Sequence, residues 1–252
     1  MNITRKEVHG IPMWAPDNEH WIAETAIDGV KEYDGQFGIV LDIGAHIGGV
    51  SLYAAKHGAS RVYAFEPAPQ NYTLLCLNIL ANSMEGIIIP FPAAIGRLSR
   101  GEPAFPMTFR ALRAGGNSGM YSLQYKEDLP TAGQVLVMDF EELLSRFPRI
   151  DYLKVDIEGG EYEIFDRSSS RLAQLLRRVV YLNLELHRLS PSFFEVHGRE
   201  GQEPMEEVIT WLVSQGFSDA PIGECMRRRA VRSFNHDFRG SDLHLSCNIF
   251  TR

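Results

Sequence analysis

Four acidic side chains and one histidine stand where short apolar runs of this sequence end. They are Asp42, Glu66, Asp156, Glu185 and His187. In open α/β sheets, a ligand binds outside the carboxyl ends of the strands, near the point where the strand order reverses. Carboxylates there can accept hydrogen bonds from ligand hydroxyls, and a histidine can exchange a proton near neutral pH. The residue types and positions therefore predict a polar ligand site with acid–base chemistry at one edge of a sheet.

A β-α-β unit is expected to position the first two of these acids. Residues 39–43 form a short apolar run, which is typical of a strand buried on both faces of a parallel sheet. A glycine-rich turn over 44–49 leads into a helix over 50–56, and a second strand over 61–65 ends at Glu66. The carboxyl ends of these two strands meet at one edge of the sheet, so we expect Glu66 near the glycine turn.

The glycine spacing indicates which ligand this turn accepts. Gly44, Gly48 and Gly49 do not form the G-x-G-x-x-G motif that places a helix N-terminus against a pyrophosphate, and the sequence has no Gly-Lys-Ser/Thr P-loop. A carboxylate at the end of the second strand lies near a ribose, whose hydroxyls need an acceptor. We therefore expect a nucleoside without phosphates, most simply S-adenosylmethionine (SAM). The alternative is a β-α-β unit that binds nothing.

Four sequence blocks together resemble the FkbM-type SAM-dependent methyltransferases. The blocks are Asp42-Ile43-Gly44-Ala45-His46-Ile47-Gly48, then Phe65-Glu66-Pro67 with Asn71 and Leu74 behind it, then Leu153-Lys154-Val155-Asp156-Ile157-Glu158-Gly159-Gly160-Glu161, and finally Leu184-Glu185-Leu186-His187. Two residues depart from the family pattern: His46 replaces the usual Asn, and Gly160 the usual Ala. Neither departure changes the framework of glycines and acids, but we expect His46 to alter contacts to the methionine part of SAM.

This resemblance implies a Rossmann-like class I methyltransferase fold with SAM as the cofactor. We expect an α/β architecture, in which helices flank a mostly parallel sheet with an antiparallel C-terminal strand over 243–250. The expected cofactor-binding residues are Asp42, Gly44, Ala45, His46, Gly48, Glu66, Pro67, Asn71, Ala94, Asn117, Ser118 and Asp156. Ala94 is included because an adenine could lie against the small apolar side chains near it.

The catalytic residues are expected at the ends of two later strands. Methyl transfer from a sulfonium is an in-line displacement, so the protein must align the acceptor and, for a hydroxyl, remove its proton. We expect His187 to be the base, held by Glu185 or Asp156. A structural His187 that caps its strand is one alternative. In another, the same carboxylates and imidazole hold Mg²⁺ or a similar ion, although we expect no metal.

The leading functional hypothesis is an O-methyltransferase that acts on a hydroxyl of a small molecule. The substrate class, such as a natural-product or sugar intermediate, is implied by the resemblance alone. The alternatives are an N-methyltransferase, whose amine acceptor needs less help from a base, and a non-catalytic binding protein with the SAM fold.

Length, charge and cysteine content limit the partners and the compartment. The chain has 252 residues and a net charge of −7, which argues against nucleic acid as a partner. It has no apolar run long enough for a membrane helix and no signal-peptide core at its start, and its three cysteines have no metal-like spacing. We therefore expect a cytoplasmic protein with a small-molecule substrate and no membrane contact, and leave a homo-oligomer open.

The rest of the chain is expected to support this site. Residues 1–36 form an N-terminal cap segment before a SAM-binding domain over 37–252; prolines interrupt residues 1–18, and a helix follows over 19–33. The glycine-rich turn 115–119 either closes over the ligand or joins a hairpin. We interpret Asp139, three residues before Glu142, as a helix cap rather than a catalytic acid.

Overall fold

A computed structural model describes most of the chain. The described residues are 2–31, 33, 35–98, 104–111, 121–122, 131–158, 160–187, 204–220 and 245–251.

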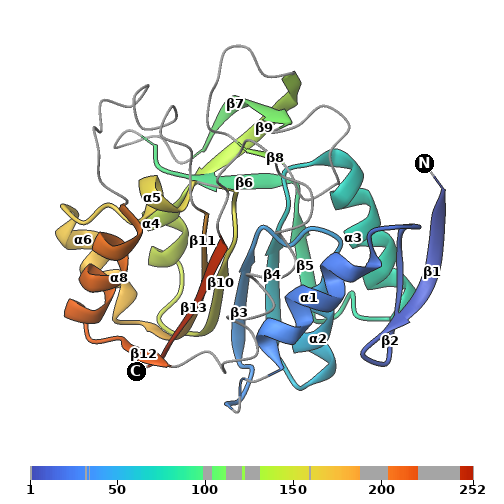
Figure 1. Cartoon of the computed structure of the whole chain (residues 1–252), viewed down its shortest axis with the longest axis horizontal. Helices are drawn as coiled ribbons and strands as arrows, with labels where there is room; N and C mark the ends of the chain where they lie inside the picture. Colours follow the sequence, from blue (N-terminus) through green and yellow to red (C-terminus); the bar gives the residue numbers. More distant parts are fainter. Residues whose placement is uncertain are drawn as a thin grey trace.

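A seven-stranded sheet forms the centre of the protein, in the order β12-β13-β11-β10-β3-β4-β5 (Figure 1). The strands are β3 (Ile39–Ile43), β4 (Arg61–Phe65), β5 (Ile88–Phe91), β10 (Ile150–Val155), β11 (Val179–His187), β12 (Ser218–Ala220) and β13 (Leu245–Thr251). Neighbours from β5 to β11 pair in parallel, whereas β13 is antiparallel to both β11 and β12. The predicted sheet with its antiparallel C-terminal strand is confirmed.

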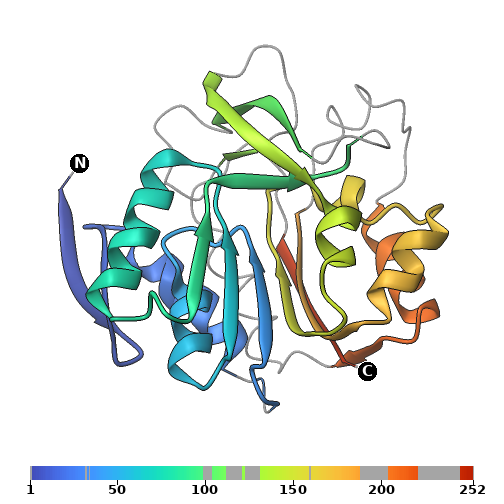
Figure 2. The same cartoon turned by 180° about the vertical axis from the view of Figure 1, so that it is seen from behind.

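Helices cover both faces of this sheet, which explains why its strands are apolar on both sides (Figures 1 and 2). One face packs against α1 (His20–Val30), α2 (Gly49–Lys56) and α3 (Pro69–Ala81). The other packs against α4 (Phe140–Ser145), α5 (Glu161–Ile164), α6 (Ser170–Leu176) and α8 (Pro204–Ser214). Along β10, Tyr152 therefore belongs to the first hydrophobic cluster and Leu153 to the second.

The N-terminal residues form a β-hairpin, so the expectation of an irregular segment over 1–18 was wrong. β1 (Ile3–Val8) pairs with β2 (Ile11–Pro16) in an antiparallel arrangement. The connecting residues His9 and Gly10 have φ of +48° and +71°, as the tightest hairpin turns require. In a two-stranded sheet both strands are edge strands, where proline is tolerated. Hairpin side chains enter the hydrophobic cluster beneath α1, α2 and α3.

Helix α1 also differs in detail from the sequence prediction. It ends at Val30, and its buried apolar positions include Ala23 and Ile27, whereas Trp21 is 43% exposed. The close contact with α2 explains which face of α1 is buried: a Cβ added at Gly49 of α2 would lie 3.1–3.3 Å from atoms of Ala23. Small residues at this crossing let α1 lie directly against the helix that follows the glycine turn.

A second, four-stranded sheet is inserted between β5 and β10. Its order is β6-β9-β7-β8, formed by β6 (Ala93–Gly96), β7 (Ala104–Ala111), β8 (Tyr121–Ser122) and β9 (Thr131–Asp139). Because β6 begins two residues after the last residue of β5, this sheet lies at the carboxyl edge of the central sheet, where Figure 1 shows it. The sequence predicted strand character in this region but not a separate sheet.

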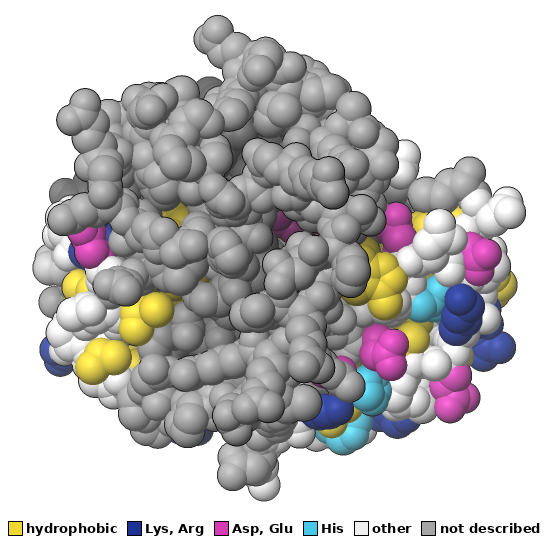
Figure 3. Space-filling model, viewed as in Figure 1, with side chains coloured by type: hydrophobic (Ala, Val, Ile, Leu, Met, Phe, Trp, Pro, Cys, Tyr) yellow, Lys and Arg dark blue, Asp and Glu magenta, His cyan; other side chains and the backbone are white. Residues whose placement is uncertain are grey.

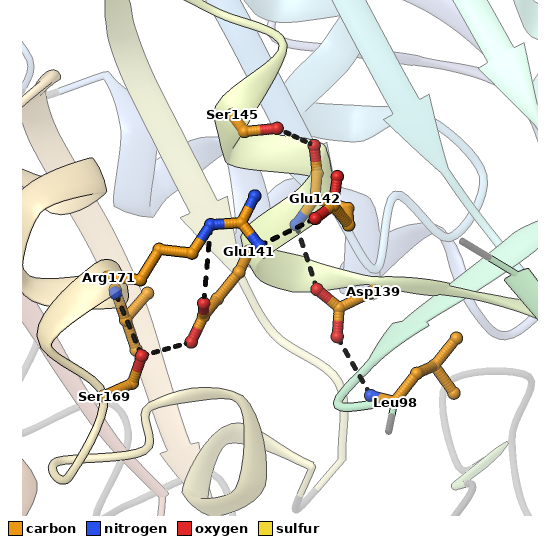
Figure 4. Close-up of polar contacts among 8 residues, drawn as sticks. Leu98, Asp139, Glu141, Glu142, Ser145, Ser169 and Arg171 are labelled. Carbon is orange, nitrogen blue, oxygen red and sulfur yellow. Dashed lines mark hydrogen bonds and ion pairs between the residues drawn. The ribbon is translucent and has the colours of Figure 1, made fainter. Parts of the chain in front are cut away.

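Asp139 fastens this second sheet to the helix that follows it (Figure 4). One carboxylate oxygen accepts a hydrogen bond from the Glu142 amide at 2.9 Å, and the other accepts one from the Leu98 amide at 3.0 Å. The predicted helix cap is confirmed. A second group of contacts joins α4 to α6, where Arg171 pairs with Glu141 and Glu142.

Replacing Asp139 with Ala should lower the free energy of unfolding by about 1–3 kcal/mol, because it removes a cap worth about 0.5–2 kcal/mol and a second hydrogen bond. Urea denaturation measures the change. Asp139→Asn is the matched control: its one amide oxygen can keep the cap on Glu142, whereas its NH₂ group cannot accept from Leu98, so its smaller loss isolates the second hydrogen bond. Equal stability of Asp139→Ala and the wild type would show that neither contact matters.

Candidate active site

The glycine turn between β3 and α2 has a strained, left-handed backbone. Gly44, His46 and Gly48 have φ of +81°, +51° and +96°. The amides of Gly44 and Ala45 donate to the carbonyl of Phe65, at 3.0 and 2.9 Å, and so join the turn to the end of β4. Asparagine and histidine enter the left-handed region more readily than most residues, which explains how His46 can replace the family's Asn.

Gly44 is required by a contact within the protein. An added Cβ would lie 1.8 Å from the carbonyl oxygen of Asp156. The two strand ends are also joined by a hydrogen bond of 3.1 Å from the Asp156 amide to the carbonyl of Ile43. A glycine in such a turn can also make room for a ligand, because it has no Cβ. In the structure, the backbone of Asp156 fills that space.

Glu66 is the acid that contacts the glycine turn directly. Its side chain, on a residue only 5% exposed, accepts hydrogen bonds from the amides of His46 (2.8 Å) and Ala68 (2.9 Å), and from Asn71 Nδ2 (3.3 Å). Burial raises the pKa of Glu66 to about 7, although these donors oppose the shift. Glu66 thus connects the turn, the end of β4 and the start of α3. The predicted neighbours Pro67 and Asn71 lie in the same segment.

Asp42 lies below the turn with its side chain fully buried. One of its oxygens accepts a hydrogen bond from Ser51 of α2 at 2.6 Å, and the other lies 3.7 Å from Lys154 Nζ. The sheet register explains the second contact, because Asp42 and Lys154 are direct neighbours across β3 and β10. We therefore propose that Asp42 supports the predicted cofactor site from behind.

Asp156 is paired with Lys154, two residues before it, at 3.2 Å. Asp156 and Glu158 do not share a strand face, because β10 ends at Val155 and Glu158 has a left-handed φ of +56°. The side chain of Asp156 is 26% exposed, so a ligand at the sheet edge can reach it.

Lys154 is the residue of this site to which sequence reasoning assigned no role. Its side chain is 8% exposed and its ammonium donates to the Gly44 carbonyl at 2.5 Å. Burial alone would lower the pKa of Lys154, but the carboxylates of Asp156, Asp42 and Glu185 outweigh it and raise the pKa, so the side chain stays charged. The signal in the sequence was its position two residues before Asp156, the acid that follows β10.

Glu185 and His187 follow on β11, next to β10. Glu185 is half-buried, and its carboxylate is close enough to Lys154 to raise the pKa of that lysine. His187 is the last residue of β11 and pairs with Leu245 of β13; its side chain lies outside the described part of the structure. The structure therefore brings the backbone of His187 to the same edge as Asp156, and its role as a base stays a prediction.

The remaining predicted residues are placed as follows. Ala94 is buried in β6 of the second sheet, whereas Asn117, Ser118 and the turn 115–119 lie outside the described residues. Among the described residues, no group of three or more His, Cys, Asp or Glu side chains is arranged to hold a metal ion. The metal alternative at Asp156, Glu185 and His187 is tested by chelation below.

Comparison with known proteins identifies the family. Residues 42–218 match the model of the methyltransferase FkbM domain, so the chain belongs to this methyltransferase family, as the four sequence blocks predicted. Methyltransferase sdnD of Sordaria araneosa is 27% identical over 206 residues, covering 70% of this chain and 78% of that protein. Methyltransferase 1 of Beauveria bassiana (strain ARSEF 2860) is 26% identical over 144 residues, covering 50% and 56%.

A solved structure shares the fold. Trm5b from Pyrococcus abyssi superposes with a TM-score of 0.50 and 12% sequence identity, covering all of this chain and 56% of that one. The protein is thus a methyltransferase with the class I, SAM-type α/β fold. Among the described residues, no helix is long and apolar enough to span a membrane.

Proposed function

We propose that this methyltransferase uses SAM to methylate a hydroxyl of a small molecule. The observation that carries the cofactor assignment is the contact between Glu66 and the glycine turn, which places a buried carboxylate beside the turn at the carboxyl edge of the sheet. A carboxylate has roughly four lone-pair positions, and the three described donors leave acceptor capacity for a ribose hydroxyl. The residues therefore fit a nucleoside.

The chemistry divides between cofactor and protein. Bound SAM would supply a methyl group already activated by the positive sulfonium. In this proposal, the acceptor molecule binds beside the partly exposed carboxylate of Asp156 and the end of β11 at His187. There His187 takes the proton of the acceptor hydroxyl, and Glu185 or Asp156 holds the imidazole. Alignment of the acceptor by the same edge supplies much of the barrier reduction.

A small-molecule acceptor fits the charge of the chain better than a nucleic acid does. The net charge is −7, and in Figure 3 the described acidic and basic side chains are interspersed on the visible face. The complex of aTrm5 and tRNALeu is a structural neighbour with a TM-score of 0.48 and 11% identity. A likeness of this extent says nothing about the partner of the present chain. We also propose a cytoplasmic location, on the basis of cysteine usage.

Incubation with methyl-labelled SAM and a panel of alcohols, sugars and amines tests this proposal. Labelled product formed from hydroxyl acceptors, with the new bond identified as O–CH₃ by NMR, supports it. Label found on nitrogen would replace it with an N-methyltransferase. Cofactor binding without transfer to any hydroxyl acceptor in the panel would contradict the proposed acceptor class.

The pKa of Glu66 gives the cofactor site a specific pH dependence. A ribose hydroxyl donates to the ionised carboxylate, and with a pKa of about 7 Glu66 is largely protonated at pH 6 and largely ionised at pH 8. The affinity for S-adenosylhomocysteine should therefore be about tenfold weaker at pH 6 than at pH 8, as one group with this pKa requires. Calorimetry at both pH values measures the ratio, and Glu66→Ala is the control that should lose it. Equal wild-type affinity at both values would contradict the role of Glu66.

A further inference from the structure

The ammonium of Lys154 is surrounded by acceptors from two strand ends. Nζ lies 2.5 Å from the Gly44 carbonyl oxygen, 3.2 Å from Asp156 Oδ2 and 3.7 Å from Asp42 Oδ1. A lysine has three N–H donors and no acceptor: the Gly44 carbonyl and Asp156 lie within hydrogen-bond distance, whereas Asp42 Oδ1 is held by charge attraction alone. One side chain of β10 therefore contacts the glycine turn, the acid behind it and the acid at the edge of the sheet.

We propose that Lys154 is a positioning residue that fastens the glycine turn to the Asp156 strand end and so presets the cofactor site. The identity of the ligand in this inference rests on the proposed function. The contact that matters most is the one to Gly44, because it fixes a peptide of the turn itself.

The orientation of that peptide is determined from both sides. On one side, the amides of Gly44 and Ala45 donate to the Phe65 carbonyl. On the other, the Gly44 carbonyl accepts from Lys154. The next amide, that of His46, donates to Glu66. Without Lys154 the Gly44 carbonyl loses its charged partner, and the peptide that leads to the Glu66 contact is held by one side only.

Stability alone gives little reason for a buried charge here. Burying an ion pair costs much of what its attraction returns, and apolar replacement of both partners is often neutral for stability. Replacing one partner leaves an uncompensated charge and is costly. A variant that replaces both Lys154 and Asp42 therefore separates charge neutralisation from positioning of the turn. It relieves the charge imbalance, yet the Gly44 carbonyl still lacks its donor.

The test compares Lys154→Met, Asp42→Asn and the double variant Asp42→Asn/Lys154→Met. Three quantities are measured: the melting temperature, the affinity for S-adenosylhomocysteine by calorimetry, and the hydrogen exchange of amides in the turn 44–49. Lys154→Met alone should melt well below the wild type, and the double variant should regain most of that loss. The double variant should nevertheless bind S-adenosylhomocysteine at least tenfold more weakly than Asp42→Asn. Its turn amides should exchange at least tenfold faster, while those of α6 are unchanged.

A double variant with the affinity and turn exchange of Asp42→Asn would overturn the proposal, because Lys154 would then only neutralise a buried acid. If Lys154→Met does not fold, the comparison of the double variant with Asp42→Asn in affinity and turn exchange tests the proposal. If the wild type itself fails to bind S-adenosylhomocysteine, the proposed function fails separately. Turn exchange then decides alone: faster exchange in the double variant supports the positioning role and unchanged exchange overturns it.

Discussion

Gly44→Ala should destabilise the protein far more than Gly58→Ala, although both glycines have a left-handed backbone. Their φ values are +81° and +93°. An alanine in this conformation costs about 1–2 kcal/mol at either position. At Gly58 nothing lies within 4 Å of the added Cβ, whereas at Gly44 it would lie 1.8 Å from the Asp156 carbonyl oxygen. A backbone atom between two paired strands cannot rotate away as a side chain can.

We expect a loss of about 1–2 kcal/mol for Gly58→Ala and about 2–5 kcal/mol for Gly44→Ala, the second including an overpacking cost of about 1–3 kcal/mol. The larger loss approaches the whole stability of a marginal domain. Urea denaturation followed by circular dichroism gives both values. Losses of equal size would show that the turn and Asp156 can separate without cost. Gly44→Val should lower the free energy of unfolding further than Gly44→Ala. It is therefore not a suitable folded variant for testing cofactor binding.

Removal of His187 should lower turnover by about 10²–10⁴-fold with little change in SAM affinity, as expected for a positioned general base. At saturating SAM, where the ionisation of Glu66 no longer limits the rate, wild-type turnover should rise with pH through one ionisation near neutrality, and His187→Ala should lose that limb. The matched control is His57→Ala, because His57 is an exposed residue that stacks on Tyr53 after α2 ends. That control should keep the wild-type rate and pH profile.

Chelation separates the base from a metal at the same strand ends. EDTA should leave the wild-type rate unchanged if His187 works as a base. Inhibition by EDTA with recovery in Mg²⁺ or Mn²⁺ would instead indicate that Asp156, Glu185 and His187 hold a divalent ion. Full activity in both His187→Ala and Asp156→Asn would remove this group of residues from the chemistry altogether.

The β-α-β unit was predictable because its signals are local. Residues 39–43, the glycine turn and Glu66 are close in sequence, and their apolar pattern and glycines determine the backbone directly. The Asp139 cap was readable for the same reason, since the cap and its partner Glu142 are three residues apart. The N-terminal hairpin was not predictable from its prolines, which argue against a strand unless it lies at a sheet edge, although His9-Gly10 is a turn signal.

Long-range contacts explain what the sequence did not reveal. The need for glycine at position 44 arises from Asp156, more than a hundred residues later, and the role of Lys154 depends on the register between β10 and β3. The second sheet required pairing of β6 with β9, which are separated by a stretch with little periodicity. Gly160 stands where the family usually has Ala. An added Cβ there would lie 2.8 Å from Ile157 Cδ1, the end of a flexible side chain that can move, so the fold does not require glycine at this position.

The central claim is that Glu66 and the glycine turn form a nucleoside site for SAM. Calorimetric titration of the wild type and of Glu66→Ala with SAM, S-adenosylhomocysteine, NAD and ATP tests it most directly. Glu66→Ala also removes the acceptor of the His46 and Ala68 amides, so its titrations belong well below its own melting temperature. The wild type should bind SAM and S-adenosylhomocysteine but neither NAD nor ATP. The variant should bind about 1.5–3 kcal/mol more weakly, the range for a hydrogen bond to a charged group. Equal affinity of the two proteins for SAM, or tighter wild-type binding of NAD or ATP, would contradict the account.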